Sequence, residues 1–122
     1  MERRPAAEQV PGWVREMYAL VDAGQVDAYM GGFAEDVELR FASRAPVLGR
    51  DAVRDALGAG HAEHDMRHTI VGVWEGEDTT IVEFDVDYTY RDGRILSVPS
   101  LTLLRRRAGL IESMRIYVDQ HP

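Results

Sequence analysis

Three acidic residues alternate with apolar residues in the stretch 81–90. Aliphatic or aromatic side chains occupy the even positions, and Glu83, Asp85 and Asp87 occupy odd ones, which is the period-two pattern of a β-strand. The three carboxylates therefore share one face, about 7 Å apart. If that face lines a cavity they can take part in proton transfer, whereas on a hydrated face they only add solubility.

His68 is the second candidate for acid-base chemistry. An imidazole held by a carboxylate can accept a proton from carbon or oxygen and return it elsewhere without a metal. A two-residue turn at Gly76-Glu77 would place His68 opposite Asp85, and a longer loop would shift the pairing by one residue. A structural histidine bonded to the backbone is the alternative interpretation.

Three histidines also form the pattern His61-x-x-His64-Asp65-x-x-His68, which resembles a set of zinc ligands. We expect no metal site, because His61 and His64 fall on an exposed helix end and His68 falls on a strand. The sequence contains no phosphate-binding glycine loop, and we expect no cofactor.

Composition excludes several function classes. The 122 residues are 45% hydrophobic, which suits one domain with a real core. Cysteine is absent and all 14 basic residues are arginine, so thiolate and Schiff-base nucleophiles are excluded. The net charge of −7 disfavours nucleic acid as a partner. The arginine bias suggests a GC-rich bacterial genome, and the polar first residues predict a cytoplasmic protein with no membrane segment.

The periodicity predicts helices before strands. Apolar residues recur at helical spacing from Val10 to Val21, and further helices are expected over 25–33 and 51–57, the last ending near Gly58 or Gly60. Strands are expected over 36–41, 66–74, 79–90, 95–106 and 110–119, the last four forming an antiparallel meander. This order predicts an α+β fold with the helices on one side of a curved sheet.

A two-residue turn at Asp92-Gly93 would place the acids on the same face as Ser100 and Thr102. The opposite face, with Phe84, Tyr88 and Leu103, would then be free to form a homodimer.

The layout resembles the SnoaL-like branch of the nuclear transport factor 2-like superfamily. The resemblance implies a cone-shaped barrel in which three N-terminal helices pack on a strongly curved, mixed but mainly antiparallel sheet and enclose a pocket, commonly in a homodimer. From this resemblance we expect a SnoaL-like domain over residues 12–122, preceded by an N-terminal tail over residues 1–11. The resemblance rests on YALVDAG at 18–24, FAEDV at 33–37, GRDAV at 49–53, Arg67-His68, Asp92-Gly93 and the stretch 109–119.

Within the superfamily, the chain is most similar to scytalone-type and bile-acid-type dehydratases. Their aspartate and histidine correspond to Asp22 and His68, while Phe41 replaces the dehydratase tyrosine. Ketosteroid isomerases, limonene-epoxide hydrolases and SnoaL-type cyclases use residues that are missing at positions such as Thr102 and Ile116.

The residues and the resemblance together predict a cofactor-independent enzyme for dehydration, isomerisation or cyclisation of a small hydrophobic oxygenated molecule. The alternative is a non-catalytic ligand-binding or dimerisation module. Asp22 and Asp85 are alternative partners for His68, and Asp22 has a second interpretation as a helix cap. The expected catalytic residues are His68, Asp22, Asp85 and Asp87, and the expected substrate-binding residues are Tyr18, Trp13, Phe41, Glu83, Thr102, Met114 and Ile116.

Overall fold

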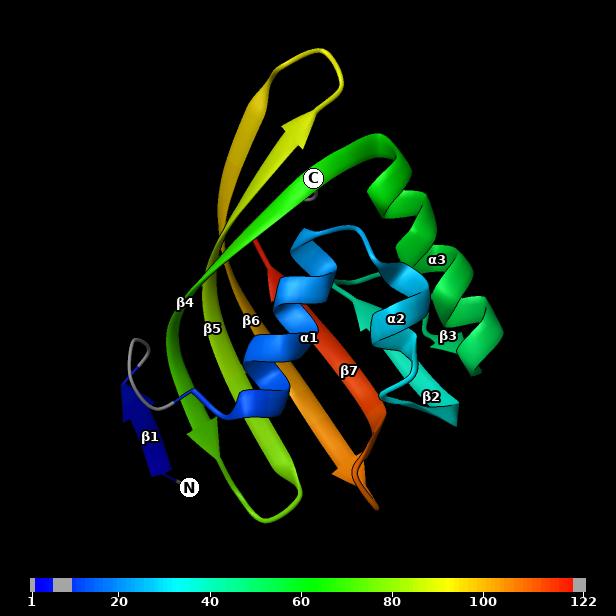
Figure 1. The fold of residues 1–122 in the computed structure, drawn as a ribbon, viewed down its shortest axis with the longest axis vertical. Helices are drawn as coiled ribbons and strands as arrows, with labels where there is room; N and C mark the ends of the chain where they lie inside the picture. Colours follow the sequence, from blue (N-terminus) through cyan, green and yellow to red (C-terminus); the bar gives the residue numbers. More distant parts are fainter. Residues whose placement is uncertain (1, 6–9, 120–122) are drawn as a thin grey trace.

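A computed structural model describes residues 2–5 and 10–119 and shows three helices packed against one curved sheet (Figure 1). The predicted α+β class is confirmed, and the three helices precede the four strands of the meander, although a short strand comes before the first helix. The elements are β1 (Glu2–Pro5), α1 (Gly12–Asp22), α2 (Val26–Met30), β2 (Phe33–Phe41), β3 (Val47–Leu48), α3 (Arg50–Glu63), β4 (His64–Glu75), β5 (Thr79–Tyr90), β6 (Ile95–Arg107) and β7 (Leu110–Val118).

Helix α1 begins directly after Pro11, a residue suited to a helix start because it has no N–H to satisfy. Its buried side chains, Val14, Met17 and Tyr18, recur at helical spacing. The helix ends at Asp22, and Gly24 follows with a φ of 70°, the left-handed conformation that turns the chain away. Asp22 is thereby the last side chain of the helix.

Two helix boundaries differ from the sequence prediction. Helix α2 stops at Met30, and Phe33 already belongs to β2, because the Gly31-Gly32 pair ends the helix early. Helix α3 runs through Gly58 and Gly60 instead of stopping there, and β4 follows it without a loop. The strand therefore starts at His64, two residues earlier than predicted.

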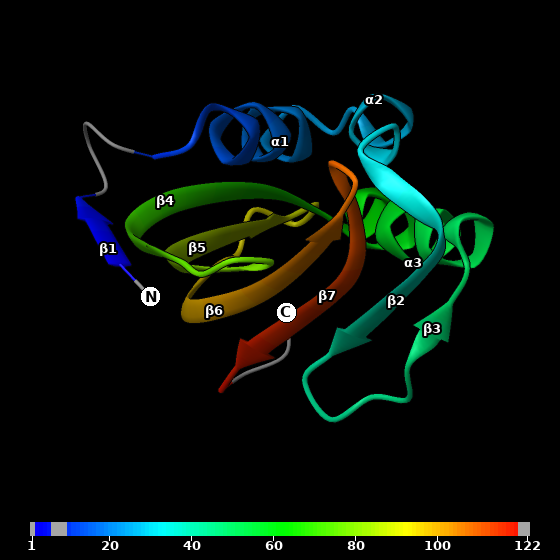
Figure 2. The same cartoon turned by 90° about the horizontal axis from the view of Figure 1, so that it is seen from below.

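The sheet has the strand order β1-β4-β5-β6-β7-β2-β3, and its pairs are antiparallel except for β2 with β7. It is open, with β1 and β3 at the edges, so the predicted barrel is a curved sheet whose hollow side is covered by helices (Figure 2). Residues 2–5, predicted to be part of a tail, pair with the end of β4. Among the described residues, no helix is long and apolar enough to span a membrane.

The β5–β6 hairpin has a register one residue away from the predicted one. Its turn contains three residues, Arg91 to Gly93, because the Tyr90 N–H donates to the Arg94 carbonyl at 2.8 Å and Gly93 adopts a φ of 91°. Phe84 therefore pairs with Ser100, and Asp85 pairs with Pro99. Since side chains alternate along a strand, this shift moves Ser100 and Thr102 to the face opposite the acids.

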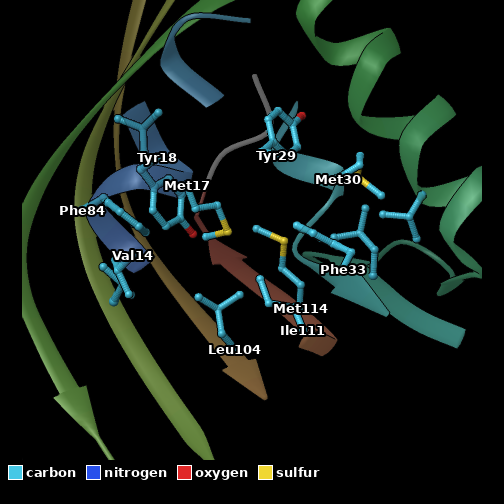
Figure 3. Packing of buried hydrophobic residues seen from close by; sticks show 14 of the residues in the cluster. Val14, Met17, Tyr18, Tyr29, Met30, Phe33, Phe84, Leu104, Ile111 and Met114 are labelled. Atoms are coloured by element: carbon cyan, nitrogen blue, oxygen red, sulfur yellow. The ribbon is translucent and has the colours of Figure 1, made fainter. Parts of the chain in front are cut away.

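The core lies between the helices and the hollow face of the sheet, where Met17 of α1 and Met114 of β7 point toward each other (Figure 3). Phe84 and Tyr88 belong to this core, with exposures of 1% and 4%. They cannot form the predicted dimer face, because the helices of the same chain cover them.

Candidate active site

A cavity of about 290 Å³ opens between α1, α3 and the hollow face of the sheet. Its volume is at the small end of the range for sites that bind small molecules. Apolar side chains form most of the wall, and the polar side chains are few. The polar and aromatic lining residues are Tyr18, Tyr29, Phe33, Phe41, Arg44, Glu63, His64, His68, Tyr88, Ser100 and Thr102.

Asp22 and His68 form the central pair of this site. The His68 Nδ1 atom lies 2.6 Å from one carboxylate oxygen of Asp22, and the His68 backbone N–H donates to the other oxygen at 2.9 Å. A carboxylate only accepts hydrogen bonds, so Nδ1 carries the hydrogen and Nε2 is left for other partners. The resemblance to dehydratases predicted these two residues, and the structure brings them together.

The position of Asp22 is unfavourable unless the carboxylate has a specific partner. A negative charge at the C-terminal end of a helix opposes the helix dipole. Its two bonds to His68 lock the imidazole and also satisfy a backbone N–H on the edge of β4, where β1 pairs only with residues 72–75. The alternative interpretation of Asp22 as a cap between α1 and α2 does not describe these contacts.

Tyr18 packs against the His68 ring, with 4.9 Å between ring centroids, and its hydroxyl is buried. Burial raises the pKa of Tyr18, and the neighbouring Thr102 hydroxyl offsets part of this effect. The two hydroxyls do not reach the geometry of a full hydrogen bond, so the Tyr18 hydroxyl has no such partner among the described residues. Tyr18 thus brings a buried hydroxyl without a full hydrogen bond to the cavity wall beside His68.

The floor of the cavity comes from the parallel pair β2 and β7, in which Phe41 is opposite Ile116 and Leu39 is opposite Met114. Phe41, Thr102, Met114 and Ile116 line the cavity, as expected from the sequence. Trp13 does not line it. Its indole is covered by the Arg106 guanidinium, 4.0 Å from the ring centroid.

The three acids of β5 are outside the cavity, so the prediction that they line it is wrong. Asp85 is exposed, Glu83 lies on the same outer face, and Asp87 accepts a hydrogen bond from the Ser97 hydroxyl at 2.6 Å. His68 pairs with Val86 instead of Asp85, because the turn after β4 is longer than two residues and a bulge lies between Ile70 and Gly72. Asp22 is thus the carboxylate that contacts His68.

Two other histidines lie near this site: His64 lines the cavity, whereas His61 contacts the lining residue Tyr29. His61 lies at 2.8 Å from the Tyr29 hydroxyl, and His64 is only 5% exposed, so the prediction of an exposed helix end was wrong for His64. Burial lowers the pKa of both rings. No group of three or more potential ligands in the described residues is arranged to hold a metal ion.

His64 was missed as a site residue because the predicted strand began at Met66. A strand that starts at His64 would have placed positions 64, 66 and 68 on one face, and all three line the cavity. The alternation of inward and outward side chains, extended two residues toward the N-terminus, was the signal that could have revealed His64.

Comparison with solved structures shows the same fold in proteins of low sequence identity. A hypothetical protein from Catenulispora acidiphila, with a ketosteroid isomerase-like fold and bound trimethylamine, is 23% identical with a TM-score of 0.81, covering 89% of this chain and 86% of that one. A proposed polyketide cyclase from Xanthomonas campestris is 22% identical with a TM-score of 0.81, covering 87% of each chain. SalBIII, an epoxide hydrolase/cyclase-like enzyme in pyran ring formation of salinomycin, is 18% identical with a TM-score of 0.80, covering 88% of each chain.

Among curated proteins, none matches the sequence significantly. The family model of the SnoaL-like domain matches residues 14–114, a segment that contains most of helix α1, the cavity lining except Ile116, and the Asp22–His68 pair. The chain therefore belongs to the family of SnoaL-like domains.

Proposed function

We propose that this protein is a cofactor-independent enzyme that moves a proton on a small hydrophobic oxygenated substrate. The observation that carries the proposal is the imidazole of His68 at the cavity wall, held through Nδ1 by the Asp22 carboxylate. Nε2 of His68 is the general base, Asp22 orients it, and the Tyr18 O–H donates to a substrate oxygen.

The contacts suit chemistry next to a carbonyl group. His68 removes a proton from the carbon beside the carbonyl, while the Tyr18 hydroxyl stabilises the charge that develops on the carbonyl oxygen. The proton then leaves with a hydroxyl group as water, which is dehydration, or returns to another carbon, which is isomerisation. The enclosing apolar walls limit access of water and strengthen these interactions.

The test is exchange of carbon-bound hydrogen for solvent deuterium in a panel of small cyclic ketones and hydroxyketones, followed by NMR. Wild-type protein should accelerate exchange in at least one compound, and His68→Gln and Asp22→Asn should remove the acceleration. Asp85→Asn is the matched control, because Asp85 is exposed on the outer face. Equal exchange rates in wild type and His68→Gln would refute the proposal.

The second candidate is a ligand-binding module without catalysis. It is favoured by Phe41, Thr102 and Ile116, which offer no ionisable group at positions where related enzymes use one. Binding of the same ketones without any accelerated exchange would support this function.

We also propose a homodimer through the outer face of the sheet, which carries Leu103 of the face first considered but not the buried Phe84 and Tyr88. Leu101 and Tyr117 are paired on that face, with exposures of 36% and 52%. Sedimentation of wild type and Leu101→Asp tests this proposal. A monomeric wild type at micromolar concentration would contradict it.

A further inference from the structure

His64 is a buried polar group that the proposed proton transfer does not use. Its side chain lines the cavity, and its Nδ1 atom is fully buried with no hydrogen-bond partner beyond its own backbone in the described part of the chain. The rings of Tyr88 and Tyr90 are nearly perpendicular to the imidazole, with centroids at 4.9 and 5.6 Å from it. A phenylalanine at this position would make the same apolar contacts. Packing alone therefore does not explain why the residue is a histidine.

The ring is held in a fixed position. β4 follows α3 without a loop, and the Arg91 guanidinium bridges the two elements by donating to the His61 carbonyl at 2.8 Å and to the Asp65 carboxylate at 2.9 Å. Cations near the C-terminal end of a helix stabilise its unpaired carbonyls. These contacts tie the chain on both sides of His64, and its buried ring packs against Tyr88 and Tyr90.

His64 and His68 lie on the same face of β4 with Met66 between them, and all three line the cavity. Four residues of strand separate their Cα atoms by about 13 Å. The cavity therefore has a hydrogen-bonding group at each end of an apolar wall. Burial favours the neutral form of His64, and the neighbouring Glu63 also lines the cavity, so an anion is disfavoured at this end.

We propose that His64 is a substrate-binding residue that forms a hydrogen bond with a neutral oxygen, a hydroxyl or a carbonyl, at the end of the ligand remote from His68. The substrate class is then an elongated apolar molecule with an oxygen function at each end. This inference rests on the proposed function in one respect: it assumes that the end of the substrate that reacts lies at His68.

The test compares two probes that share one skeleton. Para-hydroxybiphenyl carries a hydroxyl at one end, and para,para′-dihydroxybiphenyl carries one at each end. Dissociation constants are measured by isothermal titration calorimetry for wild type, His64→Phe, His64→Gln and the control Tyr90→Phe, which keeps the ring beside His64. Thermal unfolding followed by circular dichroism verifies that each variant is folded.

We expect wild type and Tyr90→Phe to bind the dihydroxy probe about fivefold to tenfold more tightly than the monohydroxy probe, the effect of one hydrogen bond. His64→Phe should lose this preference and His64→Gln should keep part of it. A preference that persists in His64→Phe, or none in wild type, would overturn the inference, as would failure of both probes to bind.

The titration needs no turnover, so the two proposals fail separately. A preference that depends on His64, combined with no accelerated deuterium exchange in any ketone, would contradict the proton-transfer function and leave the role of His64 intact.

Discussion

Replacing Asp22 with asparagine should reverse the hydrogen-bonding state of His68. The carboxylate accepts two bonds from His68, whereas an amide has one accepting oxygen and one donating nitrogen. If the amide oxygen keeps the backbone N–H, the amide nitrogen faces Nδ1 and donates to it. The hydrogen of the imidazole then moves to Nε2, the atom that would have to accept a proton from the substrate.

The magnitude follows from the contacts. A hydrogen bond to a charged group contributes about 1.5–3 kcal/mol and a neutral one about 1 kcal/mol. The side chains of Asp22 and His68 are 27% and 11% exposed. Because water partly screens their interaction, we expect the loss of stability to lie toward the lower end of this energy range. Asp22→Asn should therefore lower the free energy of unfolding by about 1–2 kcal/mol, or the midpoint of thermal unfolding by roughly 4–8 °C. Activity should fall further, by about 10⁴-fold, as a wrong tautomer causes in serine proteases.

Two assays test this reasoning without a known substrate. Long-range proton–nitrogen NMR spectra of protein labelled in histidine should show the hydrogen on Nδ1 of His68 in wild type and on Nε2 in Asp22→Asn. Denaturation gives the change in stability, and Asp85→Asn should change neither measurement because Asp85 is exposed. The same tautomer in both proteins, or a stability change below about 0.5 kcal/mol, would show that the pair does not act as described.

Three further outcomes are expected. Tyr18→Phe should change the unfolding free energy by less than about 1 kcal/mol, because the hydroxyl lacks a full hydrogen bond, while it slows ketone exchange by about 10²-fold, as measured by NMR. Burial lowers the pKa of His64, so the unfolded chain binds more protons below about pH 6.5 and wild type should lose stability relative to His64→Phe as pH falls from about 7.5 to 5.5, as measured by denaturation. Leu104→Ala should cost about 2–5 kcal/mol in the same assay, since Leu104 is fully buried; a smaller loss would mean that the core relaxes around the cavity.

The sequence predicted the strands well because their alternation is strong. β5 has the predicted bounds, and its even positions are buried from Thr80 to Tyr88, as expected for a strand with two chemically different faces. What alternation cannot decide is which face is inside. An assumed two-residue turn at Asp92-Gly93 put the acids on the same face as Thr102, and the family resemblance placed that face toward the pocket. One extra residue in the turn moves Thr102 to the face opposite the acids.

The Asp22–His68 contact joins residues 46 positions apart and follows no local pattern. Composition and periodicity left Asp85 as an equally good partner for His68, and only the resemblance to a known family favoured Asp22. Contacts between a helix end and a distant strand depend on how the helix crosses the sheet, which the sequence does not encode in any short motif. His64 was missed for a smaller reason, an error of two residues in a strand boundary.

The three-residue turn between β5 and β6 also limits how related proteins can vary in length. Deleting one of its residues would reverse the facing of β6 relative to β5, turning Thr102 outward and Leu103 into the cavity. Two-residue insertions preserve the facing of every side chain. A single insertion requires a compensating bulge elsewhere, like the one between Ile70 and Gly72 in β4. We therefore expect natural relatives with a working cavity to change this loop in steps of two residues, or by one together with a bulge.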